Sequence, residues 1–511
     1  MTEARSDDLV PDSVIPHHNL PPLRYRDLPE PVAWRTMVGP SVMLAGLALG
    51  SGEFVFWPHV VYRTGFVFYW ACMLGVITQF FVNMEIERWT LATGESAITG
   101  FCRLSKTWGP VMLVLNIVPW AWPGWGTGAA SMMSWLVFGP LEVVKEGVTT
   151  YEARYVREIS IALLVLVGIV LTTGPVVYNT VERLQKFLVT IIVVIAIVIG
   201  CVVIRGDAFV AMIAGVRNVG TMPDLGESGL TMMQLLGALA FAGAGGTMNL
   251  GQSHFIKDKG YGMGKYIGRI TSPLTGQEEP IADVGYHFPH TPENMRRWKQ
   301  WWRAANIEHF MSFYLTCVVC LCLLALISYS LFRDETGALK PGMDRFGSGM
   351  SFVWGESTLI GEARFGSLLK PAFFIMGIAL LFTTELGVLD VVARISTDIV
   401  KVNYLRENSA WSQGRLYYCF LWGEIALGTI ILLQPVFSEP MVLLKISAAM
   451  NGAVMFLYSL VLLYMNNKVL SRSLSMSPLR FVAVVWSCAF FGYFSLQALR
   501  IELLPLLFGG K

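Results

Sequence analysis

Long apolar stretches alternate with short polar segments along almost the whole chain. Apolar runs of about 20 residues are long enough for an α-helix to cross the hydrocarbon core of a bilayer. Lipid offers no hydrogen bonds to the backbone, so such runs predict membrane-spanning helices. The pattern predicts eleven spans, at residues 38–62, 66–86, 109–138, 158–178, 184–204, 229–254, 307–332, 367–392, 415–434, 440–465 and 480–503.

The composition agrees with a membrane protein. Of the 511 residues, 54% are hydrophobic and 14% are charged, and the mean hydropathy is +0.54. An average soluble domain has about 25% charged residues. We therefore expect an all-α integral membrane protein that has the lipid bilayer as a partner and binds no nucleic acid. Its oligomeric state is not predicted.

Polar residues interrupt two of the predicted spans. The first contains Gly50-Ser51-Gly52-Glu53, and the sixth contains the glycine-rich run 242–252. An ionisable group near the membrane midplane costs roughly 2.5 to 3.5 kcal/mol, so it is typical of a polar cavity, a cation site or a proton route. Glycines allow a helix to unwind and turn its carbonyl groups towards a ligand. Alternatively, the glycines only permit close helix packing.

Broken helices at corresponding positions of two halves are typical of secondary transporters with inverted repeats. The predicted organisation has four parts: a disordered cytosolic tail (1–37), a first five-helix repeat (38–204), a second five-helix repeat (205–465) and a last helix with a C-terminal tail (466–511). The second repeat includes a long cytosolic loop, 255–306. With the N-terminus placed inside, the inside segments hold 24 of the 38 Lys and Arg residues, eight of them in this loop. We therefore expect a multi-pass protein of the cell membrane with a cytosolic N-terminus and an outside C-terminus.

Several short motifs resemble the natural-resistance-associated macrophage protein (Nramp) family of divalent-metal transporters. They are Gly39-Pro40, the break ten residues later, Thr93-Gly94-Glu95, the run 181–186 and Asn249-Leu250. The resemblance implies a LeuT-like fold of two inverted five-helix repeats in which helices 1 and 6 are broken.

The chain departs from the family at both breaks. The family has Asp-Pro-Gly-Asn in the first break, where only Gly52 matches and Glu53 replaces the asparagine. In helix 6 the family has Met-Pro-His-Asn-Leu. Aligning Asn249 puts Gly246 at the position of the metal-binding methionine, whereas a shifted alignment brings His254 onto a later family histidine.

The candidate residues for binding the transported solute lie in the two breaks. They are Gly50, Ser51, Glu53, Gly246, Thr247, Met248, Asn249 and Gln252, with Glu53 and Asn249 as candidate metal ligands. Each also has a structural interpretation: Glu53 as a buried ion pair or hydrogen bond, and the amides of Asn249 and Gln252 as links between helices.

Four other residues are candidates for a proton route or a coupling-ion site. Glu385 and Glu424 lie within the predicted spans 367–392 and 415–434, His59 lies near the outer end of helix 1, and His254 follows the second break. Intramembrane acids are typical of proton relays, and histidine titrates in the physiological range. An interfacial histidine is the alternative for His59.

The sequence contains no catalytic constellation and no nucleotide-binding motif. We therefore expect neither an enzyme nor a bound cofactor, but a secondary active transporter of a divalent cation, for which proton coupling is an option. Carboxylate, amide and carbonyl oxygens favour Mg²⁺ or Mn²⁺ over softer metals. Two alternatives stay open: a transporter of a small organic solute such as an amino acid, and a non-transporting membrane sensor that uses the loop 255–306.

Overall fold

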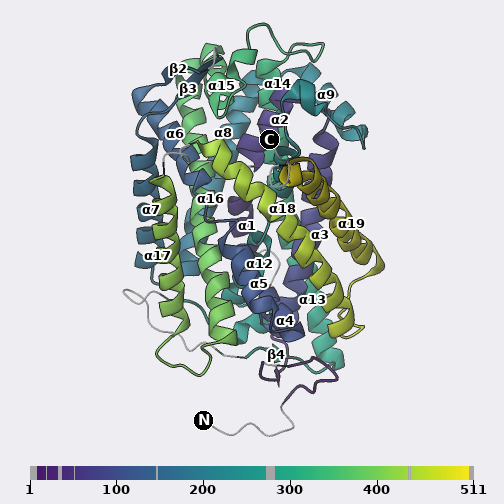
Figure 1. The fold of residues 1–511 in the computed structure, drawn as a ribbon. Helices are drawn as coiled ribbons and strands as arrows, with labels where there is room; N and C mark the ends of the chain where they lie inside the picture. Colours follow the sequence, from purple (N-terminus) through teal and green to yellow (C-terminus); the bar gives the residue numbers. More distant parts are fainter. Residues whose placement is uncertain are drawn as a thin grey trace.

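The protein is a tall bundle of helices in the computed structural model (Figure 1), which describes residues 9–18, 20–32, 37–50, 52–145, 148–271, 282, 284–434, 437 and 439–505. Eight helical segments in this part are long and apolar enough to cross a membrane. They are Pro40–Thr64, Val156–Thr173, Val177–Val203, Pro292–Phe332, Gly366–Asn403, Gln413–Leu432, Pro440–Val469 and Pro478–Glu502. The chain is thus an all-helical, multi-pass membrane protein.

The other three predicted spans are helical as well, and two of them are split. The span predicted at 66–86 is one helix, α3 (Tyr69–Thr93). The span predicted at 109–138 is divided into α5 (Trp108–Ile117) and α6 (Gly124–Phe138). Pro119 and Pro123 lie between these helices, where a proline cannot continue the hydrogen-bond ladder. The span predicted at 229–254 consists of α11 (Met232–Ala240) and α12 (Met248–Lys259).

The remaining elements complete the bundle and its two ends. The membrane-spanning segments comprise α1 (Pro40–Ala48), η3 (Gly52–Phe56), α2 (Trp57–Thr64), α7 (Val156–Thr173), α8 (Val177–Val203), α13 (Pro292–His309), η5 (Phe310–Tyr314), α14 (Leu315–Phe332), α16 (Gly366–Asn403), α17 (Gln413–Leu432), α18 (Pro440–Tyr464), η8 (Met465–Val469), α19 (Pro478–Ala498) and η9 (Leu499–Leu503). The shorter elements are β1 (Arg24–Tyr25), α4 (Ala97–Leu104), β2 (Leu141–Lys145), β3 (Val148–Glu152), α9 (Gly206–Arg217), α10 (Leu225–Ser228), η4 (Gly262–Tyr266), β4 (Tyr286–His287), η6 (Asp344–Phe346) and α15 (Ser351–Glu362).

The two broken spans lie inside the bundle. Helix α1 packs against α8, α12 and α16, and α12 packs against α3. In the first broken span, 94% of the most apolar 18-residue stretch is buried inside the protein. In α8 only 22% of the corresponding stretch is buried. Neighbouring helices therefore shield α1, η3 and α2 from lipid, as a helix with an internal carboxylate requires.

The two ends of the bundle carry different elements (Figure 1). The antiparallel hairpin of β2 and β3 lies at the upper end with α9 and α15, whereas α4, α13 and β4 lie at the lower end with the N-terminal segment. The side of the membrane to which each end belongs stays a prediction from charge, as does the division into two repeats.

The N-terminal segment corrects one expectation. The sequence predicts a disordered tail over 1–37, but its described residues pack on the lower end of the bundle, where Val10, Leu23 and Leu28 are buried. β1 pairs in parallel with β4, and the Trp301 indole of α13 donates a hydrogen bond to the Pro29 carbonyl at 2.9 Å. Apolar residues spaced along a proline-rich stretch supply enough buried surface to hold this segment.

The predicted loop 255–306 is also shorter than expected. Helix α12 continues through Lys259, and α13 already begins at Pro292 and joins α14 through η5. The stretch around Trp298 is therefore the first part of a long helix. Trp298 and Trp301 are buried against the bundle, which explains why this polar sequence is helical.

Candidate solute-binding site

The first break lies between α1 and the π-helical η3. Helix α1 ends at Ala48, and the Thr384 hydroxyl of α16 donates a hydrogen bond to the carbonyl of Leu47 at 3.1 Å. Gly50 approaches the same threonine so closely that an added methyl group would lie 2.0 Å from its hydroxyl oxygen. Ser51 lies outside the described residues. α16 thus holds this break in place.

The second break is supported by a residue that the sequence analysis missed. Between α11 and α12 the chain leaves the helical path, and Gly245 and Gly246 have φ angles of +73° and +48°. The side-chain amide of Gln79 on α3 donates to the Ala240 carbonyl at 2.9 Å and accepts from the Gly245 N–H at 3.2 Å. Gln79 therefore satisfies two backbone groups that the break would otherwise leave unpaired.

The two breaks touch. A methyl group placed on Gly52 would lie 1.5 Å from the carbonyl oxygen of Phe241. Only a residue without a side chain fits there, so the start of η3 lies directly against the unwound backbone that follows α11. This arrangement confirms the prediction that the helix is interrupted in both spans, and it shows that the interruptions meet inside the bundle.

Glu53 lies next to this contact. The residue is completely buried, and among the described residues neither carboxylate oxygen has a hydrogen-bond partner. The Cys317 thiol of α14 lies beside the carboxylate, and Cys72 of α3 is also close to it. An unpaired buried carboxylate is costly unless a proton or another cation neutralises it.

The candidate residues of the second break have other neighbours. The Thr247 hydroxyl donates to the Asn116 side chain at 2.8 Å and accepts from the Trp120 indole at 2.9 Å. The Asn249 amide donates to the Tyr458 hydroxyl of α18 at 2.9 Å. Met248 is buried. In the described residues no hydrogen bond joins Glu53 to Asn249, although both have unpaired buried oxygens.

Gln252 lies further towards the lower end of the bundle. Its amide donates to the Ser41 hydroxyl of α1 at 3.2 Å, and Ser41 in turn donates to Glu308 of α13. Gln252 thus belongs to a separate buried polar cluster below the breaks. Among the described residues, no three His, Cys, Asp or Glu side chains are grouped as a metal site would require.

Aromatic rings surround the second break. The indoles of Trp120 and Trp125 stack with centroids 5.3 Å apart, and each lies within 6 Å of the Phe241 ring. The Phe56 ring lies on Phe241 at 6.0 Å. The proline-rich bend between α5 and α6 therefore brings two indoles to the point where the breaks meet.

The four coupling candidates lie at three separate places. On α16 and α17, Glu385 accepts a hydrogen bond from the Gly126 N–H at 3.0 Å, while the neighbouring Glu424 carboxylate has no partner among the described residues. Near the upper end, the His59 ring contacts Phe352 of α15 with centroids 5.0 Å apart. Below the breaks, His254 lies near Asp398, which pairs with Lys257 at 3.8 Å.

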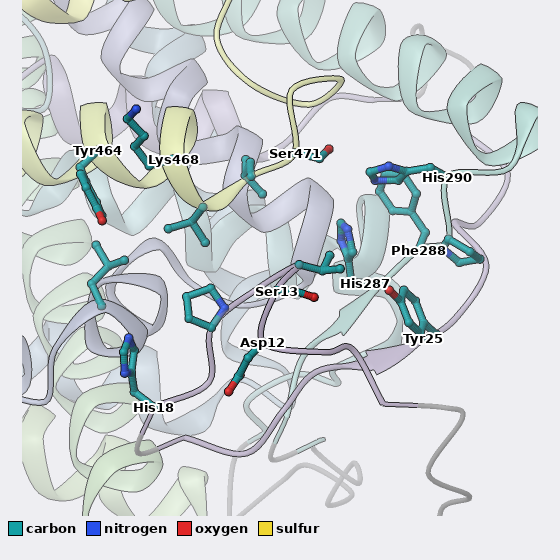
Figure 2. A pocket seen from close by; sticks show the side chains of 16 residues that line it. Asp12, Ser13, His18, Tyr25, His287, Phe288, His290, Tyr464, Lys468 and Ser471 are labelled. Atoms are coloured by element: carbon teal, nitrogen blue, oxygen red, sulfur yellow. The ribbon is translucent and has the colours of Figure 1, made fainter.

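Three cavities at the ends and the side of the bundle do not include the breaks. The largest, about 720 Å³, lies at the lower end between the N-terminal segment, the 287–290 loop and η8. Figure 2 shows His287, His290 and Tyr25 at one side of it and Lys468, Tyr464 and His18 at the other. Burial lowers the pKa of His287 to about 4, so this imidazole is neutral near pH 7.

Comparison with known proteins gives a likeness in structure. No family model and no curated protein match the sequence. The fold, however, matches two mutant structures of the manganese transporter from Eremococcus coleocola, each with a TM-score of 0.63 and 12% identity, over 99% of this chain and 93% of theirs.

A further match is that manganese transporter in complex with an aromatic bis-isothiourea substituted compound, with a TM-score of 0.62 and 11% identity, over 95% of this chain and 91% of the other. The chain therefore shares the fold of these manganese-transporter structures. The structural match confirms the resemblance seen in the motifs and supports the LeuT-like fold. At this identity the likeness establishes the fold alone.

The Nramp-like fold clarifies one difference from the family pattern. Gly246, which aligns with the family methionine, has a left-handed backbone, and an added methyl group would lie 1.8 Å from the Asn451 side-chain oxygen. A methionine at this position would be strained, so the backbone of the second break itself favours glycine here.

Proposed function

We propose that this Nramp-like protein is a secondary active transporter that carries a cation through the contact between its two breaks by alternating access. One observation carries the proposal: Glu53 is fully buried, has no hydrogen-bond partner among the described residues and follows directly on Gly52, which touches the backbone of the second break. A carboxylate in that position gains several kcal/mol from a neutralising cation.

The construction of the breaks supports movement about this point. Both interruptions are short, and the second uses two glycines in left-handed conformations. Broken helices with binding groups at the break are the usual site of solute binding in transporters of this architecture, where one bundle rocks against the other. The fold likeness to a manganese transporter supports the same class of function.

The oxygen donors favour a hard divalent cation, Mg²⁺ or Mn²⁺. The Glu53 carboxylate, the Asn249 side-chain oxygen and the Phe241 carbonyl are the donor type that these ions prefer. Glu53 and Asn249 have no direct link in this conformation, so binding both to one ion would require the breaks to rearrange. Cys317 and Cys72 lie close to Glu53, and their thiols would favour a softer metal.

A small organic solute that carries an ammonium group, such as an amino acid, is the second candidate. The observation that favours it is the group of rings from Trp120, Trp125, Phe56 and Phe241 around the second break. Aromatic faces attract organic cations, whereas a metal ion bound by oxygen gains little from them.

Uptake by the purified protein in liposomes distinguishes these candidates. The panel contains Mg²⁺, Mn²⁺, Cd²⁺ and a set of amino acids, each with empty liposomes as the control. We expect uptake of Mg²⁺ or Mn²⁺ that Cd²⁺ inhibits only weakly, and a Cys317→Ser variant that keeps this uptake. Uptake of an amino acid without any divalent ion would instead support the organic solute, and preferred Cd²⁺ uptake would contradict the hard-cation proposal.

A further inference from the structure

A row of polar residues runs down α3 from the second break towards the lower end. Gly75 faces Ala242, to which an added methyl group would come within 3.1 Å, and Gln79 one turn later bonds the break itself. Asn83 and Glu87 follow at the same spacing of four residues, so they lie on the same side of the helix. Helix α12 packs against α3.

Asn83 and Glu87 are completely buried, yet their polar atoms are unpaired. Among the described residues, both side-chain atoms of Asn83 and both carboxylate oxygens of Glu87 have no hydrogen-bond partner. The Gln252 side chain of α12 lies close enough to interact with Glu87, and its own oxygen has no hydrogen-bond partner among the described residues. Buried polar groups are normally satisfied, so three neighbouring exceptions on two packed helices point to a ligand.

The basic side chains in this region already form ion pairs with other acidic residues. Arg480 pairs with Glu85 at 3.4 Å, and Arg88 pairs with the same Glu85 at 2.6 Å. Lys259 pairs with Glu182 at 2.7 Å. Glu85 and Glu87 are two residues apart and equally buried, but only Glu85 has ion-pair partners among the described residues.

Below Glu87 the polar groups continue. Glu308 interacts electrostatically with Glu87 and accepts hydrogen bonds from Ser41 and from the N–H groups that begin α1. Lys259, which is close to Glu308, lines a cavity of about 400 Å³ at the lower end. Buried polar atoms thus extend from the second break to the rim of that cavity.

We propose that Asn83 and Glu87, with the side-chain oxygen of Gln252, form an inner binding station for the transported cation between the breaks and the lower end. The proposal rests on the proposed transport of a cation. Carboxylate and amide oxygens are hard donors, so the station suits the same Mg²⁺ or Mn²⁺ ions. A cation released from Glu53 would meet a second unpaired carboxylate before it reaches solvent.

Thiol labelling tests the route without knowledge of the substrate. Asn83→Cys and Glu87→Cys are each placed in a background in which the exposed Cys201 and Cys419 are serine, and a charged, membrane-impermeant reagent is applied to the lower face. We expect both to react. The matched control is Val82→Cys, which is equally buried but about 100° around the helix from Asn83, and it should not react.

Lys259→Cys at the lower cavity serves as the positive control. Reaction at Lys259→Cys without reaction at Asn83→Cys and Glu87→Cys would overturn the proposal, and so would equal reaction at Val82→Cys. Labelling does not depend on uptake, so this outcome differs from a failure of the proposed function, which would show as labelling without transport of any cation.

A second comparison uses the two neighbouring acids. Glu87→Gln should fold with an unchanged or higher melting temperature, because it removes an unpaired buried charge, while its uptake falls at least tenfold. Glu85→Gln should instead lower the melting temperature, because it breaks ion pairs to Arg88 and Arg480. Parental uptake by Glu87→Gln, or a loss of stability like that of Glu85→Gln, would contradict a role in cation transfer.

Discussion

Gly52 and Phe241 are in contact across the two interrupted helices: the α-carbon of Gly52 lies so near the Phe241 carbonyl that an added methyl group would come within 1.5 Å of its oxygen. The contact joins residues almost 190 positions apart and places Glu53 beside the unwound backbone of the second break. The arrangement of the whole candidate site depends on this close approach.

Gly52→Ala should therefore be severely disruptive. The methyl group would push the two breaks apart, and overpacking of this kind costs about 1 to 3 kcal/mol or more. The matched control is Gly423→Ala on α17, where an added methyl group meets nothing within 4 Å. We expect Gly52→Ala to lower the melting temperature in detergent by several degrees relative to Gly423→Ala. Equal melting temperatures would contradict the contact.

Gln79→Leu tests the support of the second break. The variant keeps the size of the side chain but leaves the Ala240 carbonyl and the Gly245 N–H without their partner, at roughly 1 to 3 kcal/mol for each buried group. Gln300→Leu, on the exposed side of α13, is the control. Thermal unfolding should show a clear loss of stability for Gln79→Leu alone; parental stability would mean that the break does not need this amide.

His287 predicts a dependence of stability on pH. Burial lowers its pKa from the ordinary 6.5 to about 4, so the unfolded chain takes up a proton before the folded protein does. The contribution of His287 to stability is therefore complete above about pH 6.5 and is lost as the pH falls towards 4. His287→Gln should weaken the drop in melting temperature over this range. An identical pH profile for the variant would refute this assignment.

The sequence predicted the broken spans well because glycine clusters and a lone acid are conspicuous in apolar runs. Helix termini such as the start of α13 were less predictable, because the polar stretch 292–306 becomes helical only when Trp298 and Trp301 are buried by the bundle. The N-terminal segment was predicted to be disordered for the same reason: Val10 and Leu23 find their buried positions only in the folded protein.

From the sequence, Glu87 is interpreted as structural and is not connected with Gln79 and Asn83, although the signal of a polar row on α3 is present. Gln79, Asn83 and Glu87 recur every four residues in an otherwise apolar span, which is the spacing of one helix face. Sequence spacing does not reveal that Glu85 has ion-pair and hydrogen-bond partners whereas Glu87 has none among the described residues. Two of the partners of Glu85, Arg480 and Asn466, come from helices that are distant in the sequence. Likewise, the separate neighbours of Glu53 and Asn249 follow from tertiary packing.

The most direct test of the account is transport by Glu53→Gln in liposomes. The substitution keeps the shape of the side chain but removes the charge that would offset the dehydration of a cation. Because Glu53 has no hydrogen-bond partner among the described residues, the variant should fold with parental or greater thermal stability while cation uptake falls at least tenfold. A folded Glu53→Gln protein that transports at the parental rate would contradict the account and make Glu53 a structural residue.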